Sequence, residues 1–209
     1  KSFDNKENVK QNLNIAKRTL FKQNKNLIIP DQYHSNKCII ATPNNPYPKC
    51  DALVTSDNSL ILGITAADCL PIIFYDQKNH VIGIAHAGWR GLVRGVVQNT
   101  LNKMINLGAQ KKSIKSIIGP CIRVRSYEVN KDFVKKLKTE YQKFAVRRMQ
   151  KIYFDLPKLA KYILLNSNIC EVHDTKKNTF LNKNYFSFRE SKKKKLKDYG
   201  RNINLISII

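Results

Sequence analysis

The chain has 209 residues, of which 42% are hydrophobic and 9% aromatic, so it can bury a substantial core and is too apolar for a disordered protein. No run of about 18 apolar residues occurs, and the sequence therefore predicts no transmembrane helix. The formal net charge of +23 is typical of nucleic-acid-binding proteins. The lysines are, however, dispersed among many asparagines, and only residues 192–195 form a compact cluster. We interpret the charge as a compositional trend and expect neither a membrane nor a nucleic acid as a partner.

The N-terminal half is predicted to contain one helix followed by short strands. The helix covers residues 5–23, because Asp4 and Glu7 have the spacing of a capping box and apolar residues then recur at helical intervals. Three prolines within residues 42–51 predict a loop. Apolar runs bounded by turn residues predict strands at 27–29, 38–41, 52–55 and 60–65.

A β-hairpin is predicted next, from two apolar runs around a polar turn at 76–79, with strands over residues 72–75 and 80–85. If Tyr75 faces His80 across the turn, Cys69 faces His86, and their Cβ atoms lie about 5 Å apart. One metal ion could then bind both the thiolate and the imidazole. Pro71 cannot donate a hydrogen bond to a neighbouring strand, so the register could slip by one residue.

The C-terminal half is predicted to be mainly helical, with strands near its end. Gly108 ends a helix over residues 92–107. Asn130 caps a second helix, and Asp155 followed by Pro157 opens a third. The second helix carries Phe133, Leu137, Tyr141 and Phe144, and strand-like runs cover 114–118, 185–188 and 205–209. The elements together predict a single α+β domain in which mixed β-sheets are flanked by helices.

The cysteines and the first residues bear on the compartment. Five cysteines, an odd number with no C-x-x-C spacing, favour reduced thiols over a disulfide framework. The first residues lack the apolar stretch of a secretory signal peptide. We therefore expect a cytoplasmic protein.

Two of the four histidines are candidate metal ligands. His86 is followed by Ala87 and Gly88, which leave room for a bound group, and His34 lies in a polar loop. His80 belongs to the hairpin turn and is expected to face solvent. A single histidine is more often a packed or surface residue than a ligand, and residue patterns alone leave that alternative open.

Other side chains have both a structural and a functional interpretation. Arg90 lies just before a predicted helix, where it could bind an anion or form part of a surface cap. Trp89 and Tyr33 could stack on a flat ring or pack in the core. Cys121 follows Gly-Pro and could be a small buried thiol. Asp68 could orient a histidine ligand or cap a turn.

Several short motifs occur in order along nearly the whole chain. They are Gln32–Ser35, Asp51–Thr55, Ala67–Pro71, His86–Gly91, Ile118–Ile122, Ser126–Val129, Phe154–Pro157, Phe186–Arg189 and Gly200–Arg201. With this combination the chain resembles the YfiH-like proteins, also called laccase-domain or polyphenol oxidase-like proteins, a family with purine nucleoside phosphorylase activity. The resemblance implies a sandwich-like α+β fold over residues 1–209. The family's amino-terminal segment is missing, and we expect it to precede Ser2.

The resemblance also implies a site and a reaction. His34, Cys69 and His86 would hold a metal ion, with zinc expected and copper as the alternative. The implied chemistry is phosphorolysis of purine nucleosides to free base and ribose 1-phosphate, with deamination of adenosine. We hypothesise that Arg90 acts with the three ligands in catalysis by orienting phosphate, and that Tyr33 and Cys121 line the substrate pocket. A monomer or small homo-oligomer is expected.

Three other functions are weighed against this one. A multicopper laccase would need about ten histidine ligands, and the chain has four histidines. Cys69 activated by His86 could instead be the nucleophile of an amide hydrolase acting on cell-wall precursors. A non-enzymatic module would bind nucleic acid in a salt-dependent way.

Overall fold

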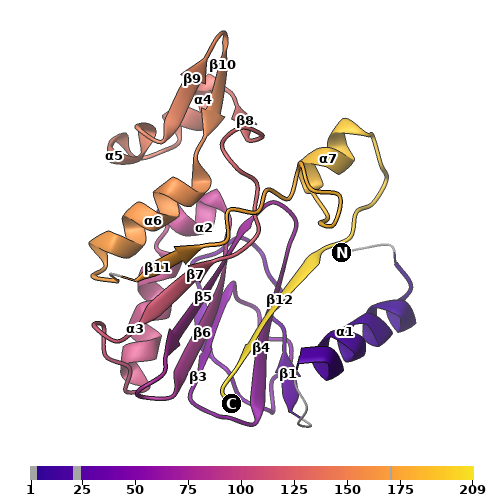
Figure 1. The fold of residues 1–209 in the computed structure, drawn as a ribbon, viewed down its shortest axis with the longest axis vertical. Coiled ribbons are helices and arrows are strands. Elements are labelled where there is room, and N and C mark those ends of the chain that lie inside the picture. The colour runs from indigo at the N-terminus through magenta and orange to yellow at the C-terminus, as the bar shows by residue number, and fades with distance from the viewer. Residues whose placement is uncertain (1–3, 21–24, 170) are drawn as a thin grey trace.

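A six-stranded mixed sheet forms the centre of the computed structural model, which describes residues 4–20, 25–169 and 171–209 (Figure 1). In spatial order its strands are β11 (Val172–Asp174), β7 (Lys115–Ile118), β5 (Leu70–Asp76), β6 (Val81–Ala87), β3 (Ala52–Thr55) and β2 (Cys38–Ile40). The two outer pairs, β2 with β3 and β7 with β11, are parallel. The inner pairs are antiparallel, and β5 and β6 form the predicted hairpin.

A second sheet covers one face of the large sheet. It consists of β1 (Asn26–Ile28), β4 (Leu60–Ala66) and β12 (Asn202–Ser207). Successive side chains of a strand point to opposite faces. Leu53, Ile82 and Ile84 therefore pack between the two sheets, whereas Val54 and Ala85 pack on the other face. This arrangement confirms the predicted α+β sandwich.

Helices cover the other face of the large sheet (Figure 1). They are α2 (Trp89–Val93), α3 (Val96–Asn106) and α6 (Leu156–Asn166), while α1 (Lys6–Leu20) and α7 (Phe188–Lys193) lie outside this layer. The apolar stripe of α3 is buried against the sheet through Val96, Val97, Leu101 and Met104. Within the described ranges, none of the helices combines the length and apolarity that crossing a bilayer requires.

A third, small antiparallel sheet lies at one end of the molecule (Figure 1). It contains β8 (Glu128–Val129), β10 (Lys151–Phe154) and β9 (Ala145–Arg148), and α4 (Lys131–Lys135) and α5 (Thr139–Gln142) accompany it. The rings of Phe133 and Phe154 meet edge to face with centroids 5.0 Å apart, and Trp89 contacts Phe133 at 4.9 Å. These aromatic contacts join the small sheet to the main core.

Most of the predicted elements are confirmed. β1, β2, β3, β4 and β7 lie within one residue of the predicted bounds. Asn130 accepts a hydrogen bond from the Phe133 N–H at 2.8 Å, and Asp155 accepts one from the Lys158 N–H at 3.1 Å, so both residues cap helices. Gly108 follows α3 with a φ of 98°, the left-handed conformation expected at a helix end.

The predicted register of the hairpin is wrong by two residues. Pro71 lies opposite His86, and Tyr75 lies opposite Ile82. A slip of two residues keeps each side chain on its original face, whereas a slip of one would reverse it. Cys69, just before β5, therefore still shares a face with His86.

Two predicted helices are each broken in two. The helix expected over residues 92–107 is α2 followed by α3, because Gly95 has a φ of 93° and interrupts the helical backbone. The helix expected after Asn130 is α4 followed by α5, with extended backbone at Lys138 between them. α1 begins with the Glu7 N–H bound to Asn5 rather than to Asp4. The predicted residues 21–23 of that helix lie outside the described ranges.

The C-terminal predictions need two corrections. The predicted strand at 185–188 is not a strand, because the Ser187 hydroxyl accepts the Glu190 N–H at 3.1 Å and caps α7. The last strand begins three residues earlier than predicted, where Asn202 pairs with Ala66 of β4. β8, β9, β10 and β11 were not predicted, since they are short or strongly charged.

The buried carboxylate of Asp76 holds the hairpin turn. It accepts hydrogen bonds from the Ser113 hydroxyl at 2.6 Å, the Asn79 side-chain amide at 2.7 Å and the Gln110 N–H at 2.8 Å. We expect Asp76→Asn to lower the free energy of unfolding at neutral pH by about 2 kcal/mol, because an amide cannot accept all of these donors. Urea titration of the two proteins measures the change, and equal stability would contradict the prediction.

The same variant has a predicted pH signature. Burial raises the pKa of Asp76, but the hydrogen bonds from Ser113, Asn79 and Gln110 outweigh burial and hold the pKa below its usual value. With a lowered folded-state pKa, the stability that this carboxylate contributes is present above about pH 4 and is lost as the pH falls through the folded-state value. Asp76→Asn should therefore lose less stability than the parent on acidification below about pH 4.

Candidate metal centre

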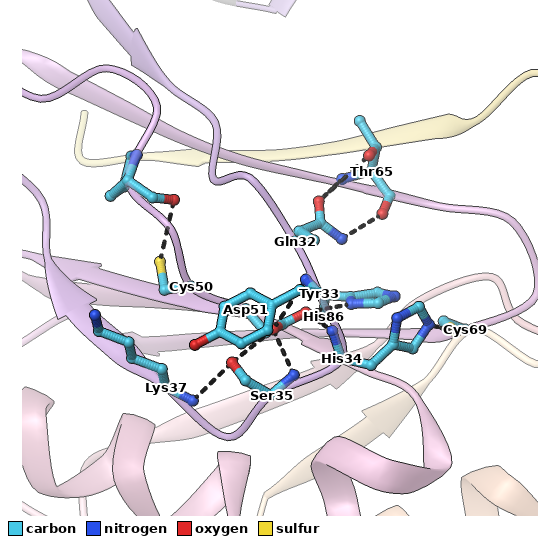
Figure 2. Close-up of polar contacts among 11 residues, drawn as sticks. Gln32, Tyr33, His34, Ser35, Lys37, Cys50, Asp51, Thr65, Cys69 and His86 are labelled. Atoms are coloured by element: carbon cyan, nitrogen blue, oxygen red, sulfur yellow. Dashed lines mark hydrogen bonds and ion pairs between the residues drawn. The ribbon is translucent and has the colours of Figure 1, made fainter. Parts of the chain in front are cut away.

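Three potential metal ligands converge at one end of the β5–β6 hairpin (Figure 2). His34 comes from the loop between β1 and β2, Cys69 from the bend before β5, and His86 from the end of β6. Their donor atoms all lie within 4.8 Å of one another. The two imidazole rings meet edge to face, with centroids 4.9 Å apart. The structure thus brings together the three predicted ligands from distant parts of the chain.

The spacing of the donor atoms suits one tetrahedral ion. Zinc bonds of about 2.0 Å to nitrogen and about 2.3 Å to sulfur, at a tetrahedral angle, separate the two donor atoms by about 3.5 Å. The Sγ of Cys69 and the Nε2 of His34 are 3.6 Å apart. Three protein ligands with a fourth position left open are typical of catalytic zinc sites. The donor set therefore fits a single metal ion.

A buried carboxylate, Asp51, supports two of the three ligands (Figure 2). Its Oδ1 accepts a hydrogen bond from Nδ1 of His86 at 2.8 Å and another from the backbone N–H of His34 at 3.0 Å. Its Oδ2 accepts the N–H of Ser35 at 2.6 Å and the Ser35 hydroxyl at 2.7 Å. A proton held on Nδ1 leaves Nε2 of His86 available for a metal, as in carboxylate–histidine–metal triads.

The loop that carries His34 is anchored at a second point. The side chain of Gln32 donates to the Thr65 carbonyl and accepts from the Thr65 N–H, both at 2.8 Å (Figure 2). His34 itself has a φ of 63°, in the left-handed region that non-glycine residues adopt at a cost. The bonds to Asp51 and Thr65 therefore hold a conformation that the loop alone would not favour.

The local charges change the titration of the site residues. Burial raises the pKa of the Cys69 thiol, but the nearby His86 and the contact with His34 outweigh burial and lower the pKa to about 6. Burial lowers the pKa of His86, whereas Cys69 and Asp51 raise it to about 9. Burial raises the pKa of Asp51, but hydrogen bonds from His86 and Ser35 lower it to about 2. Cys69 is therefore set up as a thiolate near neutral pH, the form that binds metals.

Gly88 keeps the backbone close to the ligands. A Cβ at this position would lie 3.0 Å from Cδ2 of His34 and 3.1 Å from Sγ of Cys69. Any side chain there would press on both ligands, so the absence of one preserves their geometry. Whether the small residues after His86 also leave room for a bound group stays a prediction.

Asp68 binds the first turn of α7 instead of orienting a histidine. Its carboxylate accepts hydrogen bonds from the Thr179 hydroxyl at 2.7 Å, the Ser187 hydroxyl at 2.9 Å and the Arg189 N–H at 2.6 Å. These bonds fasten the first turn of α7 beside Cys69. The observed contacts of Asp68 therefore match neither of its two predicted roles, since they hold a distant helix rather than a histidine or its own turn.

The remaining predicted site residues lie outside the ligand cluster. Arg90 is exposed in the first turn of α2, with its guanidinium 4.7 Å from the centroid of the Trp89 ring. Tyr33 is 47% exposed and donates its backbone N–H to Asp51. Cys121 is fully buried, and burial raises the pKa of its thiol to about 12. Contact of these three residues with substrate stays a prediction.

Comparison with known proteins places this chain in a family. A protein-family model described as multi-copper polyphenol oxidoreductase laccase matches residues 1–209. The chain belongs to this laccase-like family. The Neisseria meningitidis protein NMB0706, described as DUF152, is 28% identical and superimposes with a TM-score of 0.87 over 99% of this chain and 84% of that one. Bacillus licheniformis YfiH, 23% identical, has the same fold with a TM-score of 0.87 over 100% and 84% of the two chains.

Curated relatives of this laccase-like chain are named for a different activity. Purine nucleoside phosphorylase RP494 of Rickettsia prowazekii is 29% identical over 175 residues, which cover 81% of this chain and 72% of the relative. Purine nucleoside phosphorylase SSP1584 of Staphylococcus saprophyticus is 32% identical over 146 residues, or 65% and 54% of the two chains. A purine nucleoside phosphorylase of Deinococcus radiodurans is 45% identical over 82 residues, or 39% and 32%.

The residues present do not fit the several copper ions that the family description names. The chain has four histidines. Across the described residues, His34, Cys69 and His86 are the one group of three or more metal-ligating side chains with converging donor atoms. That set holds one ion, and a blue-copper centre with a trinuclear cluster needs several more ligands. We therefore assign this laccase-like chain no multicopper oxidation.

Proposed function

We propose that this chain is a zinc-dependent purine nucleoside phosphorylase that also deaminates adenosine. The proposal depends on the convergence of His34, Cys69 and His86, in a chain whose relatives are named purine nucleoside phosphorylase. Its substrates would be purine nucleosides and phosphate, and its products free base and ribose 1-phosphate. We prefer zinc to copper because two imidazoles and a thiolate with an open position are typical ligands of catalytic zinc.

The side chains of the site have distinct roles in this proposal. When bound, zinc supplies a Lewis acid and lowers the pKa of a coordinated water toward 7. Asp51 keeps the proton on Nδ1 of His86 and fixes the direction of Nε2. The exposed Arg90 orients phosphate, and Tyr33, exposed beside His34, flanks the nucleoside. Cys121 would line the pocket with a buried thiol that stays protonated, and it has no further role in this proposal.

Phosphorolysis exchanges one bond for another at the sugar. The bond between the anomeric carbon and the purine nitrogen breaks, and a phosphate oxygen bonds to the same carbon. The base leaves with the bonding electrons and takes up the proton that the attacking hydrogen phosphate gives up. Positive charge develops on the sugar in an oxocarbenium-like transition state, as in other glycosyl transfers. Arg90 favours this step by holding the phosphate dianion close to that charge.

The test combines elemental analysis with product chromatography. The purified protein is expected to contain about one zinc per chain. With adenosine and phosphate it should release adenine and ribose 1-phosphate, and with adenosine alone it should release inosine. Omission of phosphate should abolish release of the base and leave deamination unchanged. A zinc-loaded protein that consumes neither adenosine, inosine nor guanosine would refute the proposal.

A cysteine hydrolase is the second candidate, because the structure places a thiolate beside two histidines. Cys69 contacts Nε2 of His34 at 3.6 Å, and its pKa of about 6 suits a nucleophile. The substrate would be an amide bond in a cell-wall precursor. Chelation separates the candidates: a cysteine hydrolase should keep its activity after removal of metal, and the zinc enzyme should lose it. Alkylation of Cys69 would inactivate both.

We further propose that residues 1–209 act as one catalytic domain in a reducing compartment. The described cysteines are free thiols, namely Cys38, Cys50, Cys69 and Cys121. Free thiols suit the cytoplasm. A site that requires the thiolate of Cys69 would also be inactivated by oxidation.

A further inference from the structure

A groove of about 870 Å³ lies between the small sheet of β8, β9 and β10 and helix α7. Figure 1 shows both elements at the same end of the molecule, beyond the large sheet. The groove is larger than a nucleoside needs and falls within the range of small-molecule sites, about 300–1,000 Å³. Its lining combines aromatic rings with cationic side chains, so its chemistry differs from that of an apolar core pocket.

Aromatic rings form part of the groove lining. They belong to Trp89, Tyr127 and Phe133, and they meet edge to face with centroid separations of 4.9 and 6.0 Å. The contacts fix the rings against the main core, so the wall is formed before any ligand binds. A fixed aromatic wall suits a nucleobase, because every base has a π-face that can stack.

Cationic side chains form another part of the lining. Five basic side chains line the groove, namely Arg125, Lys151, Arg189, Lys192 and Lys193. Glu128 is the single acidic residue of the lining, and it pairs with Lys151 at 2.9 Å. Among the described residues, no carboxylate forms an ion pair with the other four. The groove therefore carries a concentrated positive charge that the protein itself leaves uncompensated.

Two contacts restrain the guanidinium of Arg189. Its guanidinium donates to the Glu128 carbonyl at 2.9 Å and lies 5.4 Å from the centroid of the Tyr127 ring. Its backbone N–H donates to Asp68, the residue before the ligand Cys69. An arginine restrained in this way loses little conformational entropy when it binds an anion.

The groove adjoins the metal centre. Trp89 follows Gly88, whose backbone approaches Cys69 so closely that a Cβ would lie 3.1 Å from its Sγ. On the other side, Asp68 joins the α7 wall to the bend that carries Cys69. The segments that carry Cys69 and Gly88 therefore connect the candidate metal site with the lining of the groove.

We propose that this groove binds a nucleoside that carries two or more phosphate groups, with the phosphate chain on Arg125, Arg189, Lys192 and Lys193. The inference rests on the proposed function, because it adds a phosphate chain to the nucleoside assigned there. One inorganic phosphate would use only part of so many uncompensated cations. A diphosphate or triphosphate chain spreads its charge along the wall and can contact most of them.

Trp89 provides the probe, since it is the single tryptophan of the chain and lines the groove. Its fluorescence is titrated with adenosine, phosphate and ADP, using the metal-free protein to prevent turnover. ADP is expected to bind at least about tenfold more tightly than adenosine or phosphate, because charge-assisted bonds are added. The affinity for ADP should fall as salt is raised. Equal affinity for adenosine and ADP would overturn the proposal.

Charge-reversal variants locate the phosphate chain. Lys192→Glu with Lys193→Glu should weaken ADP binding by more than about tenfold and leave adenosine binding within about twofold. Lys111→Glu with Lys112→Glu is the matched control, because it changes the net charge equally at exposed residues outside the groove lining. If both double variants weaken ADP binding equally, the effect is one of bulk charge and the proposal fails.

Two further results would separate the nucleotide groove from a nucleic-acid site and from the proposed function. If a single-stranded decanucleotide binds about a hundredfold more tightly than ADP and responds to the same variants, the groove serves nucleic acid and the nucleotide proposal is wrong. Binding of ADP is measured without turnover. A protein that binds ADP as expected but releases no base from nucleosides would therefore contradict the proposed function and leave the nucleotide groove standing.

Discussion

Replacing His86 with alanine is expected to abolish zinc binding at micromolar zinc and to reduce phosphorolysis by more than about a hundredfold. Losing a residue that only supports a metal ligand costs at most about a hundredfold, so a larger loss indicates that His86 is itself a ligand. His86 supplies one of three converging donor atoms, and Cys69 and His34 alone leave two protein ligands. Two ligands rarely hold zinc against water and competing chelators. Elemental analysis after gel filtration measures the zinc content, and product chromatography measures turnover.

The matched control is His80→Asn. His80 is an exposed histidine in the hairpin turn, on the same β5–β6 hairpin but outside the cluster. Its φ of 51° is left-handed, and asparagine tolerates that conformation better than alanine does. This variant should keep the parent's zinc content and activity. A His86→Ala protein that retains stoichiometric zinc and full turnover would show that the three side chains do not form the metal site.

The hairpin shows why the ligand pair could be predicted although the register could not. Apolar runs around a polar turn identify two strands, but the turn conformation decides which residues face each other. The observed pairing of Pro71 with His86 differs from the prediction by two residues. Because side chains alternate with a period of two, this error leaves Cys69 and His86 on one face. The prediction of a shared site was therefore insensitive to the error in register.

Helix breaks were harder to predict, because a single backbone conformation decides them. Gly95 lies within a continuous apolar stripe, and periodicity cannot tell whether a glycine continues a helix or adopts a positive φ. The segment at 185–188 has three aromatic residues in four positions, a composition that favours strands. Ser187 followed by Glu190 has the spacing of a capping box, which was the available signal for α7.

Asp51 is the functional residue that sequence reasoning missed. It precedes the fully buried strand β3, where a lone aspartate is consistent with a turn. Its partners, Ser35 and His86, lie 16 and 35 residues away, so no local pattern indicates the contacts. A charged residue directly before the apolar run Ala52–Val54 was the one signal present, since buried carboxylates need several hydrogen-bond donors.

The cationic groove could not be predicted either, because its residues are also distant in sequence. Composition shows a large positive charge but not its distribution in space. Arg125 and Lys151 come from the region of the small sheet, and Arg189 and Lys192 from α7. The fold brings these distant residues together around one groove. The lysine cluster at 192–195, interpreted from sequence as a solvated loop, begins within the last turn of α7.

Asp51→Asn is expected to weaken zinc binding by about 10- to 100-fold, the usual cost of losing the carboxylate partner of a histidine ligand. The amide oxygen can still accept a hydrogen bond from Nδ1 of His86. The amide nitrogen is a donor, however, and it would face the donor N–H of Ser35. The resulting unsatisfied donors should also lower the free energy of unfolding by about 2 kcal/mol. Competition with a fluorescent zinc chelator measures the affinity, and urea titration measures the stability.

A positioning role for Asp51 differs from a purely structural one in its effect on the imidazole. The carboxylate keeps the proton on Nδ1 when the imidazole is neutral, which in the metal-free parent requires a pH above the His86 pKa of about 9. In metal-free Asp51→Asn, the ¹⁵N spectrum of neutral His86 should show a mixture of both tautomers, whereas that of the parent shows one. Asp57→Asn is the control, because it removes the same charge at a turn where the carboxylate accepts the Ser59 N–H at 2.8 Å. That variant should bind zinc as the parent does. If Asp51→Asn also keeps the parent's zinc affinity while losing stability, Asp51 supports the fold but does not orient the ligand.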